Sequence, residues 1–152
     1  MKKLIGNYSG FINSKLSYEL HKVSFGRYQN LFSCAVRPDR YSELIVEICV
    51  FRPDVENRYP NADESYLAVD MYYYHGQELR KARREKLLLG GLREYWAIDL
   101  VRRDIKTYQE NSSGRIAEME YNFQAKVPIV SFPDIEIDVN EIFGEIGVPE
   151  VS

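Results

Sequence analysis

The chain has 152 residues, of which 45% are apolar, and its formal net charge is −3. This amount of apolar material suffices for one core, so residues 1–152 are expected to form a single domain. The net charge argues against a protein that binds nucleic acid through its overall charge. The only cysteines, Cys34 and Cys49, are too few for a disulfide framework or a zinc site. Without a long apolar run or an N-terminal signal segment, a cytoplasmic protein with no membrane partner is predicted.

The first two thirds of the chain predict strands followed by one helix. Residues up to about Val36 alternate between polar and apolar and indicate strands joined by a turn at Gly26. Residues 42–51 predict a strong strand with Val46 and Ile48 on the same face. Residues 66–74 are apolar on both faces apart from Asp70, which is typical of a central strand. Residues 75–89 predict the principal helix, and two glycines at 90 and 91 end it.

The last third predicts a β-hairpin and a short closing helix. Two strands are expected at about 94–98 and 104–108. A polar turn at 111–114 leads to one more strand. A short helix at 139–143 would have Asp138 as its N-cap and Glu141 at its N3 position. This order of elements predicts an α+β or mixed α/β fold with a mixed β-sheet.

The residues around the hairpin resemble a family signature. Residues 90–99 (GGLREYWAID) and 103–108 (RDIKTY) are similar to the "GV-x-EYW-x-VD…T-V-x-V-Y" signature of the Uma family. This bacterial family of predicted endonucleases is numerous in cyanobacteria and belongs to the PD-(D/E)XK, or restriction-endonuclease-like, superfamily. Residues 51–55 (FRPDV), 66–71 (YLAVDM) and 128–143 match its "RPDV", "DLVVEV" and "LPGLELDLAEIF" elements. The resemblance covers about 43–143 and implies a restriction-endonuclease-like core.

Asp70 is the residue on which the predicted site depends. A carboxylate inside an apolar strand is costly unless it is paired or binds a metal. Asp54 is the natural second carboxylate, because two acids that converge from adjacent strands can hold Mg²⁺ or Mn²⁺. The resemblance makes Asp54 and Asp70 the metal-binding acids of a metal-dependent DNA endonuclease. The alternatives are a turn-forming role for Asp54 and, for Asp70, a structural ion pair with an Arg of the following helix.

The chain departs from the superfamily motif in its basic residue. Tyr72 stands where the motif places Lys. In the Uma family the basic residue lies on the next helix, and counting back from Gly91 puts Arg83 there as a catalytic candidate. Arg does not act as a general base, but it can hold a phosphate. Asp39 and Glu47 remain an alternative pair of acids, because the Arg-Pro-Asp tripeptide also occurs at 37–39.

A basic run on the principal helix is the predicted contact surface for nucleic acid. Its members lie within seven residues of one another: Arg80, Lys81, Arg83, Arg84 and Lys86. Such a run can meet phosphates even on an acidic protein, although a solvated helix face is the usual meaning of the pattern. DNA is therefore the expected partner, and superfamily analogy adds a homodimer. Two functions stay open: a metal-dependent endonuclease, or a catalytically degenerate nuclease fold that binds nucleic acid or protein.

Overall fold

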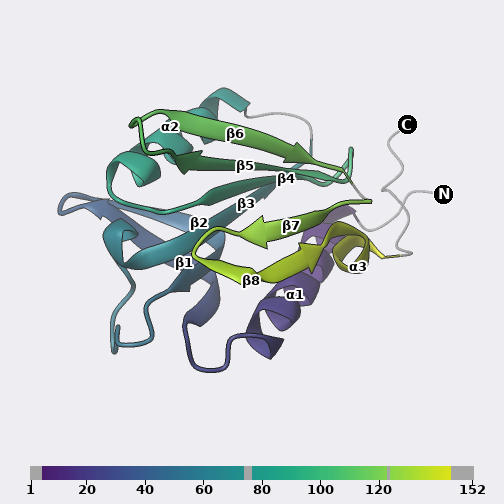
Figure 1. Cartoon of the computed structure of the whole chain (residues 1–152), viewed down its shortest axis with the longest axis horizontal. Helices are drawn as coiled ribbons and strands as arrows, with labels where there is room; N and C mark the ends of the chain where they lie inside the picture. Colours follow the sequence, from purple (N-terminus) through teal and green to yellow (C-terminus); the bar gives the residue numbers. More distant parts are fainter. Residues whose placement is uncertain (1–4, 74–76, 123, 145–152) are drawn as a thin grey trace.

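The fold is built on a six-stranded mixed sheet in the order β1-β2-β3-β4-β5-β6 (Figure 1). The computed structural model describes residues 5–73, 77–122 and 124–144. The central strands β3 and β4 are parallel, whereas every other neighbouring pair in this sheet is antiparallel. The strands are β1 (Gln29–Asp39), β2 (Ser42–Phe51), β3 (Ser65–Tyr72), β4 (Tyr95–Asp99), β5 (Asp104–Glu110) and β6 (Ile116–Tyr121).

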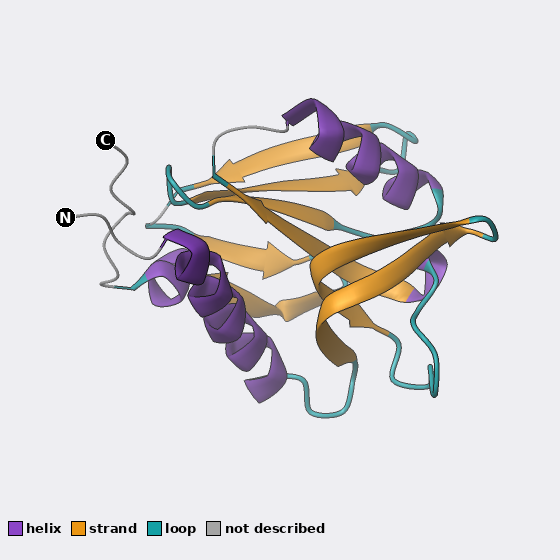
Figure 2. Ribbon diagram, turned by 180° about the vertical axis from the view of Figure 1, so that it is seen from behind, coloured by secondary structure: helices purple, strands orange, loops and turns teal. Residues whose placement is uncertain are grey.

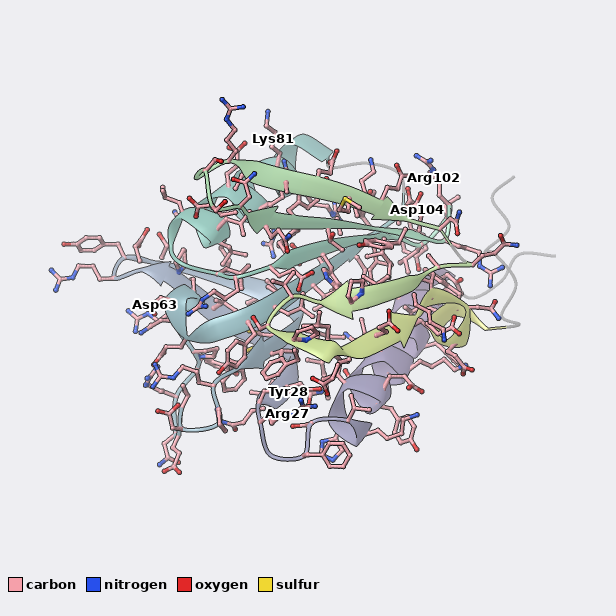
Figure 3. All side chains as sticks on the ribbon, viewed as in Figure 1. Arg27, Tyr28, Asp63, Lys81, Arg102 and Asp104 are labelled. Carbon is pink, nitrogen blue, oxygen red and sulfur yellow. The ribbon has the colours of Figure 1, made fainter. Side chains whose placement is uncertain are left out.

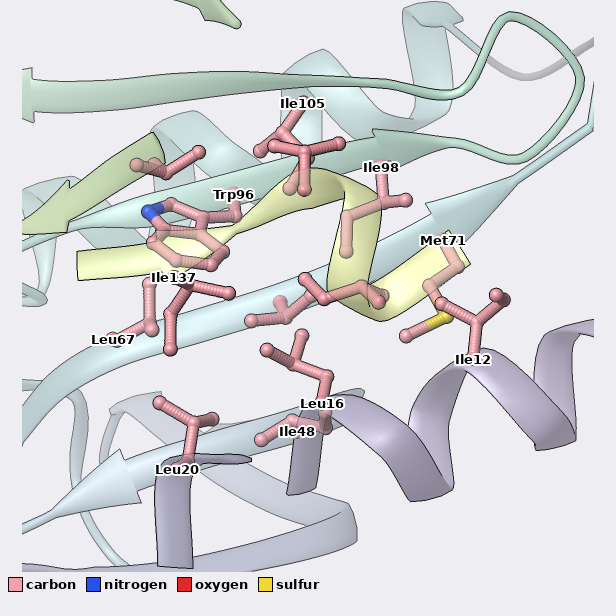
Figure 4. Close-up of a cluster of buried hydrophobic side chains, with 14 of the residues drawn as sticks. Ile12, Leu16, Leu20, Ile48, Leu67, Met71, Trp96, Ile98, Ile105 and Ile137 are labelled. Carbon is pink, nitrogen blue, oxygen red and sulfur yellow. The ribbon is translucent and has the colours of Figure 1, made fainter. Parts of the chain in front are cut away.

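Helices and a hairpin cover the two faces of this sheet (Figure 2). Helix α2 (Gln77–Leu89) connects β3 to β4 and packs on one face through Leu87 and Leu88. The opposite face is covered by α1 (Ile5–Lys22), the hairpin of β7 (Lys126–Ile129) and β8 (Phe132–Asp138), and α3 (Val139–Phe143). Trp96 packs in the core on this second face, together with Leu67 and Ile137 (Figure 4). No helix within the described ranges is long and apolar enough to cross a membrane.

The prediction of strands before Gly26 is wrong, because this segment forms α1. The apolar residues that the core buries are Tyr8, Ile12, Leu16 and Leu20, at a constant spacing of four. That spacing places them on one helix face, against β2 and β3 of the sheet. The turn at Gly26 is confirmed, since Gly26 has a φ of +77°.

The expected strand at 42–51 is confirmed as β2. The prediction that Val46 and Ile48 lie on the same face of this strand is wrong. Val46 packs in the core on the α2 face, whereas Ile48 packs on the α1 face. Because residues two apart normally share a face, the strand must be locally irregular between them. On the partner strand, Ser33 lies opposite this point with a φ of +48°.

Most of the remaining elements agree with the sequence. The central strand and principal helix are present as β3 and α2, with residues 74–76 outside the described part. Helix α2 ends at the glycine pair, where Gly91 has a φ of +107°. Asp138 caps α3 by accepting a hydrogen bond from the Asn140 amide at 2.9 Å. The hairpin of β7 and β8 was not predicted.

Candidate functional site

Asp70 and Arg83 face each other between β3 and α2. The Asp70 side chain is only 9% exposed, and both of its carboxylate oxygens accept hydrogen bonds from the Arg83 guanidinium, at 3.0 and 3.1 Å. The Tyr95 hydroxyl donates a further hydrogen bond to Asp70 at 2.5 Å. Arg83 also donates to the carbonyl of Ile45 on β2. The structure therefore brings together two of the three predicted catalytic residues, and the alternative prediction of an ion pair is confirmed.

The electrostatics of this group favour a charged Arg83 and a protonated Tyr95. Burial lowers the pKa of the Arg83 guanidinium, but its hydrogen bonds and charge interaction with Asp70 more than offset this, so the net shift is upward. Burial, followed by the charge of Asp70, raises the pKa of the Tyr95 hydroxyl. The phenol therefore stays protonated and donates to a carboxylate whose charge is already balanced.

Asp54 does not join this group. It lies in the loop after β2, where its exposed carboxylate pairs with Arg52 at 2.6 Å. The last residue of β2, Phe51, is paired with Ser65 at the beginning of β3, whereas Asp70 lies near the end of that strand. At a strand rise of ~3.3 Å per residue, Ser65 and Asp70 are separated by roughly 16 Å along β3. The expectation that Asp54 and Asp70 converge from neighbouring strands is therefore wrong.

The alternative pair, Asp39 and Glu47, is also kept apart. Asp39 ends β1 and accepts a hydrogen bond from the Tyr41 amide. Glu47 lies in the middle of β2, and its carboxylate accepts a hydrogen bond from Asn13 of α1 at 3.2 Å. Glu47 thus faces α1, whereas Asp70 faces α2 on the other side of the sheet. This orientation follows from the local irregularity of β2 described above.

The residues around Asp70 do not fit a divalent metal ion. Mg²⁺ needs several oxygen ligands that can bind it, with carboxylate charge to offset its own. The carboxylate at this place is that of Asp70, which the Arg83 guanidinium neutralises. Among the side chains that the structure describes, no group of three or more His, Cys, Asp or Glu is placed to hold a metal.

A cationic pocket of about 200 Å³ lies next to this ion pair. Its floor includes Ala97 of β4, which is paired with Asp70 in the parallel ladder. Lys81 projects outward from α2 at the pocket wall (Figure 3). The lining residues are Tyr72, Arg80, Lys81, Arg84, Ala97, Lys106, Tyr108 and Glu118. The pocket therefore holds four cationic side chains and one carboxylate, although the whole chain is acidic.

Two arginines of the pocket lie over tyrosine rings. The guanidinium carbon of Arg84 lies 3.9 Å from the centre of the Tyr108 ring, and that of Arg80 lies 4.5 Å from the centre of the Tyr72 ring. A cation–π contact of this kind restrains a long side chain, while the N–H groups of a guanidinium point outward in its own plane. Arg80 is held further by donating to the Met71 carbonyl at 3.0 Å.

The predicted basic surface is divided by the structure. Arg80, Lys81 and Arg84 line the pocket, whereas Arg83 is turned to Asp70. Lys86 lies outside the pocket lining, on the part of α2 that approaches Asp39. The pocket residues on the strands were not predicted as site residues: Tyr72 of β3, Ala97 of β4, Lys106 and Tyr108 of β5 and Glu118 of β6. In β5, strand alternation places Lys106 and Tyr108 on the same face of the sheet. This alternation was the signal in the sequence that could have identified them.

The fold is similar to that of a solved nuclease-like protein. No protein-family model matches the chain, and no curated protein matches it. The crystal structure of "a putative nuclease belonging to DUF820" from Anabaena variabilis ATCC 29413 matches it with a TM-score of 0.75 and 15% sequence identity. The match covers 94% of this chain and 84% of that chain. With its mixed sheet and its crossover helix between parallel strands, this chain has a restriction-endonuclease-like fold of the α+β class.

Proposed function

We propose that this chain is a nucleic-acid-binding domain in which a nuclease fold has lost metal-dependent cleavage. The contact surface is the cationic pocket between α2, β5 and β6, and the Asp70–Arg83 pair takes the place of a metal site. The partner is a phosphate-bearing strand, which the basic side chains hold through charge-assisted hydrogen bonds.

The observation that carries the loss of cleavage is the double hydrogen bond from Arg83 to Asp70. A nuclease of the two-carboxylate type needs acidic ligands for a cation that activates water. Here a guanidinium already supplies the positive charge at the buried acid, at 3.0 and 3.1 Å from its two oxygens. A divalent ion would have to displace a half-buried, hydrogen-bonded arginine, with a large loss of stability.

The observation that supports nucleic acid is the composition of the pocket. Arg80, Lys81, Arg84 and Lys106 surround one cavity, and Glu118 alone opposes them in its lining. Because the chain as a whole carries a charge of −3, this concentration of positive charge is local. Proteins commonly bind phosphate groups with arginine and lysine side chains that are clustered and held in place.

Metal-dependent DNA cleavage is the second candidate, and the likeness to the nuclease-like structure of Anabaena variabilis favours it. In this reading Arg83 would leave Asp70 when Mg²⁺ or Mn²⁺ and DNA bind. Asp70→Asn would then abolish nicking of plasmid DNA, because the variant removes an anionic ligand.

Two assays separate the candidates. The first follows plasmid nicking by the wild type with Mg²⁺ and with Mn²⁺, and the expected result is no nicking above that of Asp70→Asn. The second measures binding of a fluorescent DNA by anisotropy over a range of salt concentrations. Arg84→Gln and Lys106→Gln should each weaken binding and flatten its salt dependence, because each removes about one phosphate contact.

Lys86→Gln is the matched control, since it removes the same charge from α2 outside the pocket lining. It should leave the salt slope close to that of the wild type. Metal-dependent nicking that Asp70→Asn abolishes would overturn the proposal in favour of the nuclease. Equal effects of Lys86→Gln and Lys106→Gln would assign binding to diffuse surface charge.

A further inference from the structure

The shape and charge of the pocket point to one particular part of a nucleic acid. We infer that it receives a terminal phosphate monoester of a nucleic-acid strand, in preference to the phosphates inside the chain. This inference rests on the proposed nucleic-acid binding and adds the chemical group that the pocket recognises.

The first argument is the amount of charge. The lining carries four cations and one carboxylate, a surplus of three positive charges. An internal phosphodiester carries one negative charge, whereas a phosphate monoester carries about −1.5 to −2 near neutral pH. The monoester also presents three acceptor oxygens, so it can engage more of the surrounding donors at once.

The second argument is the shape of the cavity. A volume of about 200 Å³ accommodates a single phosphate group with some water. Side chains of α2 and of the strands β3 to β6 line it, and it is open to solvent on one side.

The third argument is preorganisation. Arg84 and Arg80 are held over the rings of Tyr108 and Tyr72, at 3.9 and 4.5 Å from the ring centres. These rings are therefore covered by guanidinium groups, which leaves them unsuited to stack a base directly. Burial and a hydrogen bond to the Glu118 side chain raise the pKa of the Tyr108 hydroxyl, so this ring remains uncharged beneath Arg84. The result is a rigid set of N–H donors rather than a base-stacking platform.

Glu118 opposes the binding of anions through charge repulsion. It is paired with Tyr108 across the β5–β6 ladder and supplies the one negative charge of the lining. A carboxylate at this place disfavours weakly held anions, and only a ligand that engages several cations overcomes it. Removing this charge with Glu118→Gln should tighten the binding of phosphorylated and unphosphorylated strands alike.

The test compares three single-stranded DNAs of one sequence, labelled at an internal base: one with a 5′ phosphate, one with a 3′ phosphate and one with hydroxyl groups at both ends. Anisotropy titrations of the wild type should show roughly tenfold tighter binding of the phosphorylated strands. Lys106→Gln should remove most of this preference, Lys86→Gln should keep it, and Glu118→Gln should raise all three affinities. A nucleoside 5′-monophosphate serves as competitor and should bind much more weakly than the phosphorylated strands.

The outcomes distinguish the two proposals. Equal affinity for the phosphorylated and unphosphorylated strands, with the salt dependence intact, would overturn the terminal-phosphate inference and leave nucleic-acid binding standing. No binding of any strand by the wild type would overturn both. A monophosphate that binds as tightly as the phosphorylated strands would assign the pocket to small phosphorylated molecules and overturn the inference. Circular dichroism of each variant verifies that it is folded.

Discussion

At the scale of single residues, Arg83 decides what the buried acid can do. A carboxylate inside a buried strand needs a partner, and in this chain an arginine of the next helix provides it. The same guanidinium also bonds to β2, so one side chain connects α2 to two strands. The buried acid is thereby part of the scaffold.

Removing one partner of the Asp70–Arg83 pair should lower the free energy of unfolding more than removing both partners. Arg83→Met should lower the free energy of unfolding by about 3–5 kcal/mol, because Asp70 would remain buried and unpaired. Asp70→Asn combined with Arg83→Met should recover part of this loss. The measurement is urea-induced unfolding. Arg52→Met is the control, since it breaks the exposed Arg52–Asp54 pair and should change stability by less than ~1 kcal/mol.

Asp104 is a second residue whose environment has a measurable consequence. It is buried opposite Asp99 in the β4–β5 ladder, beside the exposed Arg102 (Figure 3). Burial raises the pKa of Asp104 to about 6; Arg102 opposes this shift, and Asp99 and Glu120 add to it. The folded state therefore binds a proton more tightly than the unfolded chain, so this group stabilises the fold below its unfolded pKa.

The stabilising contribution of Asp104 should be lost as the pH rises from about 4 to about 6.5. A shift of about two units corresponds to ~3 kcal/mol at most. Asp104→Asn does not titrate, so its stability relative to the wild type should improve over this pH range. Thermal unfolding of both proteins at several pH values tests this. A stability difference that does not change with pH would contradict the assigned pKa.

At the scale of elements, the sequence predicted those parts in which local pattern and tertiary contacts agree. The run from β3 to β5 is of this kind, because buried strands, an amphipathic helix and a glycine stop are each visible locally. Helix α1 was missed because Leu16, Tyr18 and Leu20 also fit strand alternation, and only the sheet beneath the helix selects the spacing of four. The hairpin of β7 and β8 is short, with Pro128 in one strand, and depends on packing against the core.

The residues of the candidate site also fall into those that the sequence could predict and those that it could not. Asp70 and Arg83 could be predicted because their spacing is set by one strand and one helix. Asp54 could not be excluded, since its distance from Asp70 depends on where β2 ends and how it pairs with β3. Lys106 joins Arg84 only through the order of strands in the sheet, which the sequence does not state.

The glycine pair after α2 should tolerate substitution poorly. A Cβ at Gly90 would lie 2.4 Å from the carbonyl oxygen of Pro38, so the β1–β2 hairpin would have to move. We expect Gly90→Ala to lower stability by ~1–3 kcal/mol. Gly10 lies inside α1, where an added Cβ would meet no atom within 4 Å, and Gly10→Ala should raise stability by ~0.5–1 kcal/mol. Thermal unfolding that ranks the two variants in the opposite order would contradict this packing.

At the scale of the whole molecule, Glu94 connects the main sheet to the smaller hairpin. Its carboxylate is buried, and it accepts hydrogen bonds from the Trp96 indole at 2.9 Å and from the Val130 amide at 3.0 Å. Burial raises the pKa of this carboxyl, and the two hydrogen bonds oppose the shift. One side chain thus joins β4 to the turn between β7 and β8.

Glu94→Gln should weaken this connection, although the side chains of Glu and Gln have nearly the same shape. A glutamine amide has one acceptor oxygen, so one of the two N–H donors would face an NH₂ group. The expected cost is ~1–3 kcal/mol, with a change in Trp96 fluorescence because the surroundings of the indole N–H change. Glu136→Gln, on the exposed face of β8, is the control and should change neither property. An unchanged fluorescence spectrum and stability would show that the connection contributes little.

The order of strands also sets how the amide protons should exchange with solvent. Strand β4 lies in the middle of the sheet, and all of its residues are buried. Strand β6, in contrast, is an edge strand with mostly exposed side chains. Amides of β3 and β4 should exchange only on global unfolding, and those of β6 through smaller local openings. Since Glu118 of β6 forms part of the pocket, local opening there would take the pocket apart while the rest of the sheet stays folded. A bound ligand would therefore reveal itself as slower exchange along β6.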